Sequence, residues 1–235
     1  MSKSSIEWTT ETWNPVVGCS ILTPGCIHCY AMGMAARIEA INAAMVAEGR
    51  PMASPQYAGT TRTVNGHAVW TGKLAMAGDN ILLQPLKRRK PTTYFVNSMG
   101  DLFHEDCPDE WIDRVFAVMA LSPQHTFQVL TKRAQRMHDY MHERWQPRSA
   151  QRINLGGGEV LDVPAEKQGH GRHEQVFQTC EYVFDRIPAM ADTENDALWN
   201  EKGSLKCGEF AWPLPNVWLG VSTERIEATL KTGGY

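Results

Sequence analysis

The stretch TTYFVNSMGD, residues 92–101, predicts a buried β-strand that ends in a polar turn containing glycine. Its first half is rich in β-branched and aromatic residues, which are typical of strands covered by other parts of the protein. A helix is expected next, with Asp106 as its N-cap and Pro108 near its first turn. Its inner face would consist of Ile112, Val115, Phe116 and Met119. Strand and helix together form one strand–helix unit.

The same order of elements recurs on both sides of this unit. Upstream, WNPVVGC at 13–19 predicts a strand that runs into a loop, and a helix follows until Gly49. The apolar positions expected to form its inner face are Met34, Ile38, Ile41 and Met45. Downstream, HTFQVL at 125–130 precedes a helix at 133–145, and 215–222 is again strand-like. This alternation predicts parallel strands joined by helical crossovers.

We expect one domain over residues 1–235, with insertions at about 52–85 and 147–212. The first insertion carries an Asn65-Gly66 hairpin signal between β-prone residues. The second is polar and glycine-rich at first and then contains one amphipathic helix. The apolar residues of that helix are Val176, Phe177, Cys180, Val183, Phe184 and Ile187. Because parallel sheets normally continue past four strands, the fold class we expect is α/β, a partial (β/α) barrel shortened after its fourth strand.

Composition and charge exclude several classes of protein. The N-terminus has no apolar core of a secretory signal, and no window approaches the ~18 apolar residues of a membrane span. We therefore expect a cytoplasmic protein with reduced thiols and no membrane partner. The formal net charge is −3, so the whole chain does not indicate a polyanion-binding protein. The basic runs at 87–90 and 132–133 leave nucleic-acid contact open.

Cys19, Cys26 and Cys29 form the pattern C-x6-C-x2-C between the first strand and the first helix. Two thiolates three residues apart can reach one metal centre, and the longer gap lets the loop wrap around it. Iron–sulfur clusters take cysteine ligands. Because a cubane has four irons, three cysteines leave one iron able to bind a reacting molecule, whereas structural metal sites usually have four protein ligands. The spacing therefore favours an iron–sulfur centre.

Two other interpretations of these cysteines stay open. Zinc could be held by the three thiolates together with a fourth ligand. The candidates for that ligand are His28, His67, His104 and Cys107. Alternatively, the three residues are ordinary buried cysteines of a hydrophobic core.

A wider set of sequence blocks carries a resemblance. The blocks are Gly18-Cys19, Pro24–Ala31, Phe95–His104, Val129–Arg133 and Val217–Ser222. With them the chain resembles a phage and bacterial family of uncharacterised proteins that is named for its three-cysteine motif and is similar to radical S-adenosylmethionine (SAM) enzymes. The matching segments extend from Ile6 to Ser222. The first gap of the motif has six residues, as in that family, instead of the three usual in radical SAM enzymes.

The resemblance implies a concrete chemistry. Cys19, Cys26 and Cys29 would hold a 4Fe–4S cluster, and the fourth iron would bind the amino and carboxylate groups of SAM. One electron from an outside donor would cleave SAM to methionine and a 5′-deoxyadenosyl radical, which takes a hydrogen atom from a substrate. The protein would supply placement and a dry cavity.

The resemblance also implies contacts with the cofactor. Asp101 would accept from the ammonium group of SAM, and Gly100 would allow close approach of the backbone. Lys132 and Arg133 could hold the cofactor carboxylate or a substrate phosphate, or could serve only as a charge pair at the start of a helix, and Ser222 could bond to a ribose hydroxyl. The full set of expected cofactor-binding residues is His28, Tyr30, Asn97, Ser98, Met99, Gly100, Asp101, Thr131, Lys132 and Ser222.

The expected partners follow from this chemistry. They are an electron donor and a separately encoded partner protein of the three-cysteine-motif system, with nucleic acid as a candidate substrate. The alternative functions are a non-catalytic iron–sulfur or zinc protein that acts through a partner, and a nucleic-acid modification or repair factor. His104 and Glu105, just beyond Asp101, are candidates for moving protons.

Overall fold

The computed structural model of the chain describes residues 2–3, 6–142, 151–156, 159–163, 172–185 and 212–222. Its central element is a sheet with the strand order β1-β2-β7-β8-β11. These strands are β1 (Ser2–Lys3), β2 (Glu11–Trp13), β7 (Thr93–Val96), β8 (Thr126–Thr131) and β11 (Val217–Val221). The last four pair in parallel and β1 pairs antiparallel with β2. Strand order follows chain order, which confirms the expected α/β fold.

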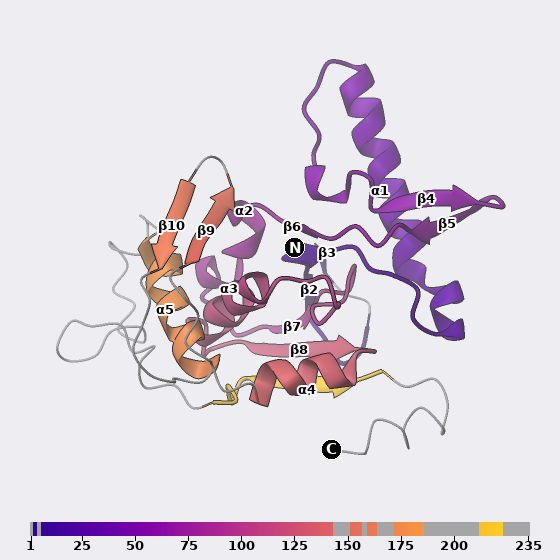
Figure 1. Cartoon of the computed structure of the whole chain (residues 1–235). Coiled ribbons are helices and arrows are strands. Elements are labelled where there is room, and N and C mark those ends of the chain that lie inside the picture. The colour runs from indigo at the N-terminus through magenta and orange to yellow at the C-terminus, as the bar shows by residue number, and fades with distance from the viewer. Residues whose placement is uncertain are drawn as a thin grey trace.

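The helices alternate with these strands, as Figure 1 shows. They are α1 (Tyr30–Ala47) after β2, α3 (Asp109–Ala120) after β7, and α4 (Ala134–His142) after β8. The short α2 (Asp79–Leu82) and the 3-10 turn η3 (Pro85–Lys87) lead into β7. The carboxyl ends of the parallel strands therefore lead into the helices, so polar residues at these ends share one edge of the sheet.

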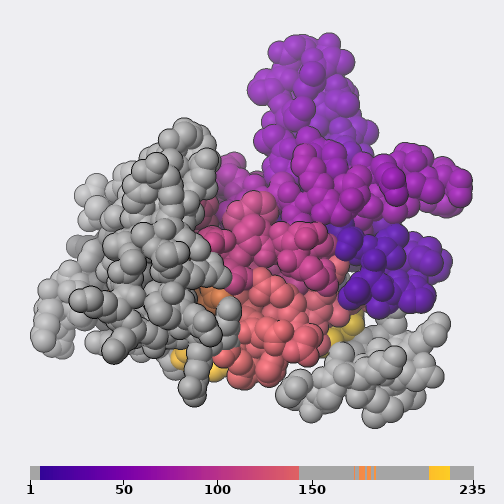
Figure 2. All heavy atoms as spheres, in the orientation of Figure 1, coloured from indigo at the N-terminus to yellow at the C-terminus, as the bar shows by residue number. Residues whose placement is uncertain are grey.

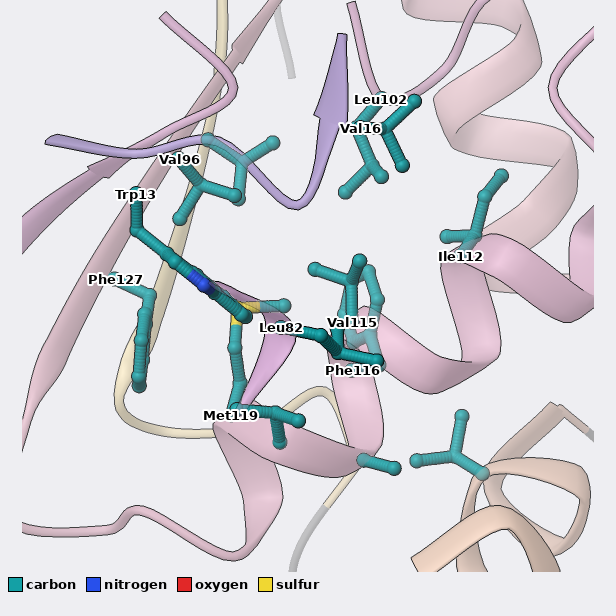
Figure 3. Close-up of a cluster of buried hydrophobic side chains, with 14 of the residues drawn as sticks. Trp13, Val16, Leu82, Val96, Leu102, Ile112, Val115, Phe116, Met119 and Phe127 are labelled. Carbon is teal, nitrogen blue, oxygen red and sulfur yellow. The ribbon is translucent and has the colours of Figure 1, made fainter. Parts of the chain in front are cut away.

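The main core lies between one face of the sheet and α3. Trp13 of β2, Val96 of β7 and Phe127 of β8 point toward α3, where Phe116 and Met119 meet them (Figure 3). All of these side chains are completely buried. The expected inner face of this helix is thus confirmed, and the period of its apolar residues is the physical reason.

The opposite face of the sheet is less covered in the described part of the chain. Cross-strand pairing places Phe95, Gln128 and Trp218 in one row on β7, β8 and β11. Trp218 is 61% exposed and Leu130, on the same strand as Gln128, is 37% exposed. In a (β/α) barrel the second face lines the interior, so a one-sided core agrees with a sheet of the barrel type.

A second, smaller core holds the first insertion against α1. The hairpin of β4 (Thr61–Val64) and β5 (His67–Trp70) packs beside α1. Asn65 and Gly66 both have positive φ, which confirms the predicted hairpin turn. The buried members of this core are Val17, Ala31, Met32, Ala35, Tyr57, Trp70 and Met99. Figures 1 and 2 show α1 and the hairpin standing out from the sheet.

The inner face expected for α1 is correct only in part, since Ile38 packs against the second core and Met45 is partly buried. Met34 and Ile41 are 46% and 50% exposed, whereas Ala31, Met32 and Ala35 are buried. The small Ala31 and Ala35 let this side of the helix approach the large side chains of the second core, and Met32 is buried in the same cluster. The predicted end of this helix is correct, since it stops at Ala47 and Gly49 adopts a φ of +71°.

Two boundaries differ from the prediction as well. The N-cap of α3 is Pro108, not Asp106, and the residues before it form turns in which the His104 amide donates to Asp101. The expected strand at 13–19 splits after Trp13, because Pro15 has no amide hydrogen for the ladder. The chain then forms β3 (Val16–Val17), which pairs antiparallel with β6 (Ala75–Met76).

The second insertion contains the predicted helix as α5 (Arg172–Asp185) and, before it, a hairpin of β9 (Gln151–Gly156) and β10 (Glu159–Val163). Val176, Cys180 and Val183 are buried against the main core. Ile187, the end of the helix expected at 133–145, and Cys207 lie outside the described residues, as does the side chain of Phe184. None of the described helices is long and apolar enough to cross a membrane.

A buried charged cluster fastens α5 to α3. Arg172 forms ion pairs with Asp109 at 2.7 Å and with Asp113 at 3.3 Å, and Tyr140 donates to Asp113 at 2.7 Å. Burial raises the pKa of Asp113 from 3.8 to about 7, against the lowering effects of Arg172 and Tyr140. The folded chain therefore binds this proton more tightly than the unfolded chain does.

We expect this proton to make stability depend on pH. Because the folded pKa is the higher one, stability due to Asp113 is lost as the pH rises from about 4 through about 7. We compare the free energy of unfolding of the native chain with that of Asp113→Asn. The native value minus the variant value should fall by about 1.4 kcal/mol between about pH 6 and about pH 8. Urea titrations at both pH values measure this difference. Asp139→Asn, at an exposed position of α4, serves as the control, and parallel pH profiles of Asp113→Asn and the native chain would contradict the prediction.

Candidate functional site

The loop that carries the three cysteines meets the end of β7 through backbone contact. Gly18 and Gly100 form a parallel bridge, and the Gly18 amide donates to the Met99 carbonyl at 3.1 Å. A Cβ on Gly100 would lie 2.9 Å from the Gly18 oxygen, and one on Gly18 would lie 2.0 Å from the Lys73 oxygen. Both glycines are thus required for close approach of backbone to backbone. This contact places the cysteine loop at the carboxyl edge of the sheet.

The cysteine loop itself is a short 3-10 helix, η1 (Pro24–His28), followed directly by α1. Cys26 is buried, while Cys19 and Cys29 are partly buried beside the second core. None of the three is in a disulfide. Around them Ile21, Leu22, Ile27 and Tyr30 are exposed, and Ile27 is 64% exposed. In Figure 2 the indigo atoms of this N-terminal region form part of the molecular surface. The loop therefore presents its cysteines close to solvent.

The segment after β8 faces the cysteine loop. Arg133, which is 5% exposed, donates to Cys19 Sγ at 3.7 Å and to Ser20 Oγ at 2.8 Å. It also forms ion pairs with Asp101 at 3.0 Å and with Glu105 at 2.6 Å. Burial lowers the pKa of Arg133, but its bond to Glu105 and the charge of Asp101 raise the pKa by more than burial lowers it. The guanidinium is therefore cationic. One side chain thus connects the cysteine loop with the ends of β7 and β8.

Asp101 is enclosed by donors from the protein. Its carboxylate accepts from Thr131 Oγ1 at 2.7 Å, from Arg133 at 3.0 Å, and from the amides of Phe103 and Lys132 at 3.0 and 3.3 Å. It is 5% exposed. The role visible in the structure is to join the ends of β7 and β8. In the same way, Gly100 is explained by its contact with Gly18. The expected contacts of Asp101 and Gly100 with a cofactor stay predictions.

The turn after β7 is held by Asn14 and Tyr30. Asn14 Oδ1 accepts from Ser98 Oγ at 3.1 Å and from the Met99 amide at 3.0 Å. Tyr30 donates from its hydroxyl to the Ser98 carbonyl at 3.1 Å, and burial raises its pKa. These bonds fix the start of α1 to the turn at Ser98.

Asn97 adopts a left-handed conformation with φ of +56°. Its side-chain oxygen accepts from the Val16 amide at 3.2 Å, but its buried Nδ2 has no partner among the described residues. An orphaned buried donor in a strained residue is typical of a place where a ligand or water binds.

Thr131, Lys132 and Ser222 share this edge. The Ser222 amide donates to the Thr131 carbonyl at 2.8 Å, which brings the end of β11 beside the end of β8. Lys132 is partly exposed, and its charge lies close enough to Cys26 to lower the pKa of that thiol. His28, by contrast, is exposed on η1. The structure therefore brings Thr131, Lys132 and Ser222 to one edge, and leaves His28 on the outer side.

The two thiols nearest the cations have different electrostatic environments. Burial raises the pKa of Cys19 to about 11, although the charge of Arg133 lowers it in part. Burial also raises the pKa of Cys26, but the bond with Thr23, the backbone bonds with Leu22 and Thr23, and the charge of Lys132 outweigh it and lower the pKa overall. The cations that follow β8 therefore lower the pKa of both thiols, but only at Cys26 do the lowering effects outweigh burial.

His104 and Ser20 resemble a nucleophile–base pair but lack its geometry. His104 Nε2 lies 2.7 Å from Ser20 Oγ, while His104 Nδ1 accepts from the Asp106 amide at 3.1 Å. Burial and the charge of Arg133 lower the pKa of His104. A neutral ring that accepts at Nδ1 carries its proton on Nε2 and donates to Ser20. It therefore orients the loop after Cys19 and does not act as a base toward Ser20.

Of the fourth ligands considered for zinc, His28 lies on the cysteine loop and His104 contacts that loop through Ser20. Cys107 is buried in the main core, His67 lies on β5, and both nitrogens of His104 are hydrogen-bonded. Among the residues that the structure describes, no three His, Cys, Asp or Glu side chains are placed to hold one metal ion.

Comparison with known proteins places the chain in a family. A family model described as "Protein of unknown function (DUF5131)" matches residues 3–232. The chain belongs to the DUF5131 family. No curated protein and no solved structure matches it. The description of DUF5131 names no activity, so the relation to radical SAM enzymes stays a proposal.

Several residues of the DUF5131 site were either missed by the sequence analysis or expected in a different role. Arg133, Ser20, Glu105 and Asn14 all contact the cysteine loop or the turn after β7. The positions of Arg133 and Glu105 in the sequence could have indicated that they belong to the site, because both follow the carboxyl end of a parallel strand. Asn14 and Ser20 carried none, since single polar residues in loops are common and only their partners make them important.

Proposed function

We propose that this DUF5131 protein binds a 4Fe–4S cluster through Cys19, Cys26 and Cys29 and uses it with SAM for radical chemistry. The observation that carries the proposal is the position of three reduced cysteines on one loop at the carboxyl edge of a parallel sheet. This edge is where α/β folds bind their ligands. The chain order of the strands and the one-sided core are in keeping with a fold of the barrel type.

A cluster suits the three cysteines better than a single zinc ion, because no three His, Cys, Asp or Glu side chains of the described residues are placed to hold one ion. A zinc ion requires its sulfur ligands to converge at about 2.3 Å from one point. In a cluster each thiolate binds a different iron, so the thiolates stay farther apart. The segment after β8 provides cations for the added negative charge, since Arg133 donates to Cys19 and Lys132 lies near Cys26.

The chemistry that the cluster supplies when bound is one electron, which breaks a carbon–sulfur bond of SAM and leaves methionine and a 5′-deoxyadenosyl radical. The residues of the chain position the cofactor and exclude water. The bonds of Asn14, Tyr30 and Asp101 hold the turn after β7 and the end of β8 in place. Asn97 Nδ2, which needs an acceptor, and Lys132 are suited to an anionic group such as the carboxylate of SAM.

The test is anaerobic reconstitution with iron and sulfide, followed by visible absorption and analysis for both elements. We expect a brown protein with about four irons per chain. Addition of SAM and dithionite should then yield 5′-deoxyadenosine, which chromatography detects. A colourless protein that retains zinc would contradict the proposal. A full cluster that yields no 5′-deoxyadenosine would support cluster binding and contradict the radical chemistry with SAM.

A second candidate is a non-catalytic cluster protein that acts through a partner. The observation in its favour is the group of exposed apolar side chains on the cysteine loop, Ile21, Leu22, Ile27 and Tyr30. Such groups on a surface often mark contact sites for another protein, here an electron donor or a separately encoded partner. A nucleic-acid role has less support, because the run at 87–90 precedes β7 and thus lies at the opposite edge of the sheet, where Arg88 pairs with Glu11 at 2.7 Å.

A further inference from the structure

The Arg133 guanidinium is placed to act on a cluster ligand. Its donors are directed to protein groups: Nε to Glu105 at 2.6 Å, Nη2 to Ser20 at 2.8 Å, and Nη1 to Asp101 at 3.0 Å and to Cys19 Sγ at 3.7 Å. The side chain is 5% exposed, so solvent screens its charge little. A planar guanidinium with this many fixed bonds cannot turn toward another ligand without breaking several of them.

We propose that Arg133 is a positioning residue that fixes the Cys19 thiolate and raises the reduction potential of the cluster. This inference rests on the proposed function. The sequence predicted that the cations after β8 hold a cofactor carboxylate or a phosphate. The contacts of Arg133 assign it to the cysteine loop instead, and leave that role to Lys132.

The physical argument concerns charge. When a cluster accepts one electron, its negative charge increases by one, and a nearby cation stabilises the reduced form more than the oxidised form. Hydrogen bonds to the ligating sulfur act in the same direction, and both are known controls of cluster potentials. Asp101 and Glu105 oppose this effect in part, but their bonds to Arg133 also keep its donor directed at Cys19. The bonds to Asp101 and Glu105 therefore hold Arg133 in place for its hydrogen bond to Cys19 Sγ.

The test uses Arg133→Met, which removes charge and donors, and Arg133→Lys, which keeps the charge and loses the planar fork. Each reconstituted protein is titrated with dithionite at controlled potential, and the visible absorption of the cluster is followed. We expect the midpoint potential of Arg133→Met to fall by at least about 59 mV, a tenfold change for one electron. Arg133→Lys should show a smaller fall. Arg89→Met, which removes an exposed cation before β7, should leave the potential unchanged.

Arg133→Met leaves the carboxylate of Asp101 without its cation, so the paired variant Arg133→Met with Asp101→Asn is measured beside it. Both should retain the iron and sulfide content of the native chain while the potential falls. Equal potentials in the native chain and in all Arg133 variants would overturn the role of Arg133 alone. A native chain that takes up neither iron nor sulfide would overturn the proposed function as well.

Discussion

Replacing Cys26 by alanine is expected to abolish the iron and sulfide content of the reconstituted protein. Three thiolates are the fewest that hold a cubane while leaving one iron open, so the loss of one leaves two anchors. Cys26 is the buried member of the set, and its thiolate is favoured by the bond with Thr23 and the charge of Lys132. Single replacements of Cys19 and Cys29 should have the same effect. Iron analysis and visible absorption after desalting measure it.

Two other cysteines provide matched controls. Cys107 and Cys180 are buried in the main core, away from the cysteine loop, and neither is in a disulfide. Alanine at either position removes one sulfur and leaves a small cavity, at a cost of about 1 kcal/mol or somewhat more. Both variants should retain the full iron content. Loss of iron in Cys107→Ala at unchanged helix content would contradict this assignment, because Cys107 would then be a further ligand of the iron centre.

Gly18→Ala is expected to displace the cysteine loop from the sheet. Gly18 has a φ of +94°, and an added Cβ would lie 2.0 Å from the Lys73 carbonyl oxygen, which is backbone and cannot turn aside. The loop or the segment at Lys73 must therefore move, and the bridge to Gly100 would break. We expect a loss of on the order of 4 kcal/mol in the free energy of unfolding, together with the loss of bound iron. Urea titration and iron analysis test the two effects.

Gly72→Ala is a close control for this experiment. Gly72 has a φ of +88°, and its amide donates to the Cys19 carbonyl at 3.2 Å, but nothing lies within 4 Å of an added Cβ. Alanine there adds the backbone strain alone, about 1–2 kcal/mol. The cluster should still bind. If Gly18→Ala and Gly72→Ala lose the same stability and both retain iron, then close packing at Gly18 does not position the loop.

The sequence predicted the parts of the fold that depend on local patterns. Strand β7 and the inner face of α3 follow from the alternation of short apolar runs and a 3.6-residue period, and both are confirmed. The hairpin at Asn65 follows from a turn whose residues tolerate positive φ. The buried face of α1 was predicted only in part, because it belongs to a cluster with Trp70 and Tyr57, which come from a distant segment.

The candidate site, too, could be predicted only in part from local patterns. The three cysteines and the polar strand ends were visible in the sequence, because residue type and spacing carry that information. The contacts that join the cysteines to the strand ends were not visible in the sequence. Arg133 lies 114 positions from Cys19 and 32 from Asp101, and only the parallel pairing of β7 with β8 and the Gly18–Gly100 bridge bring these residues together.

By itself, then, the sequence determined the α/β class, the alternation of strands and helices along the chain and the identity of the cysteine motif, since each rests on residues that are close along the chain. The tertiary structure alone decided which residues surround that motif: a guanidinium on Cys19, a carboxylate enclosed by protein donors at Asp101, and two glycines where strand ends touch. The physical reason is that burial, charge and close backbone contact are properties of residues that folding brings together, and no local pattern records them.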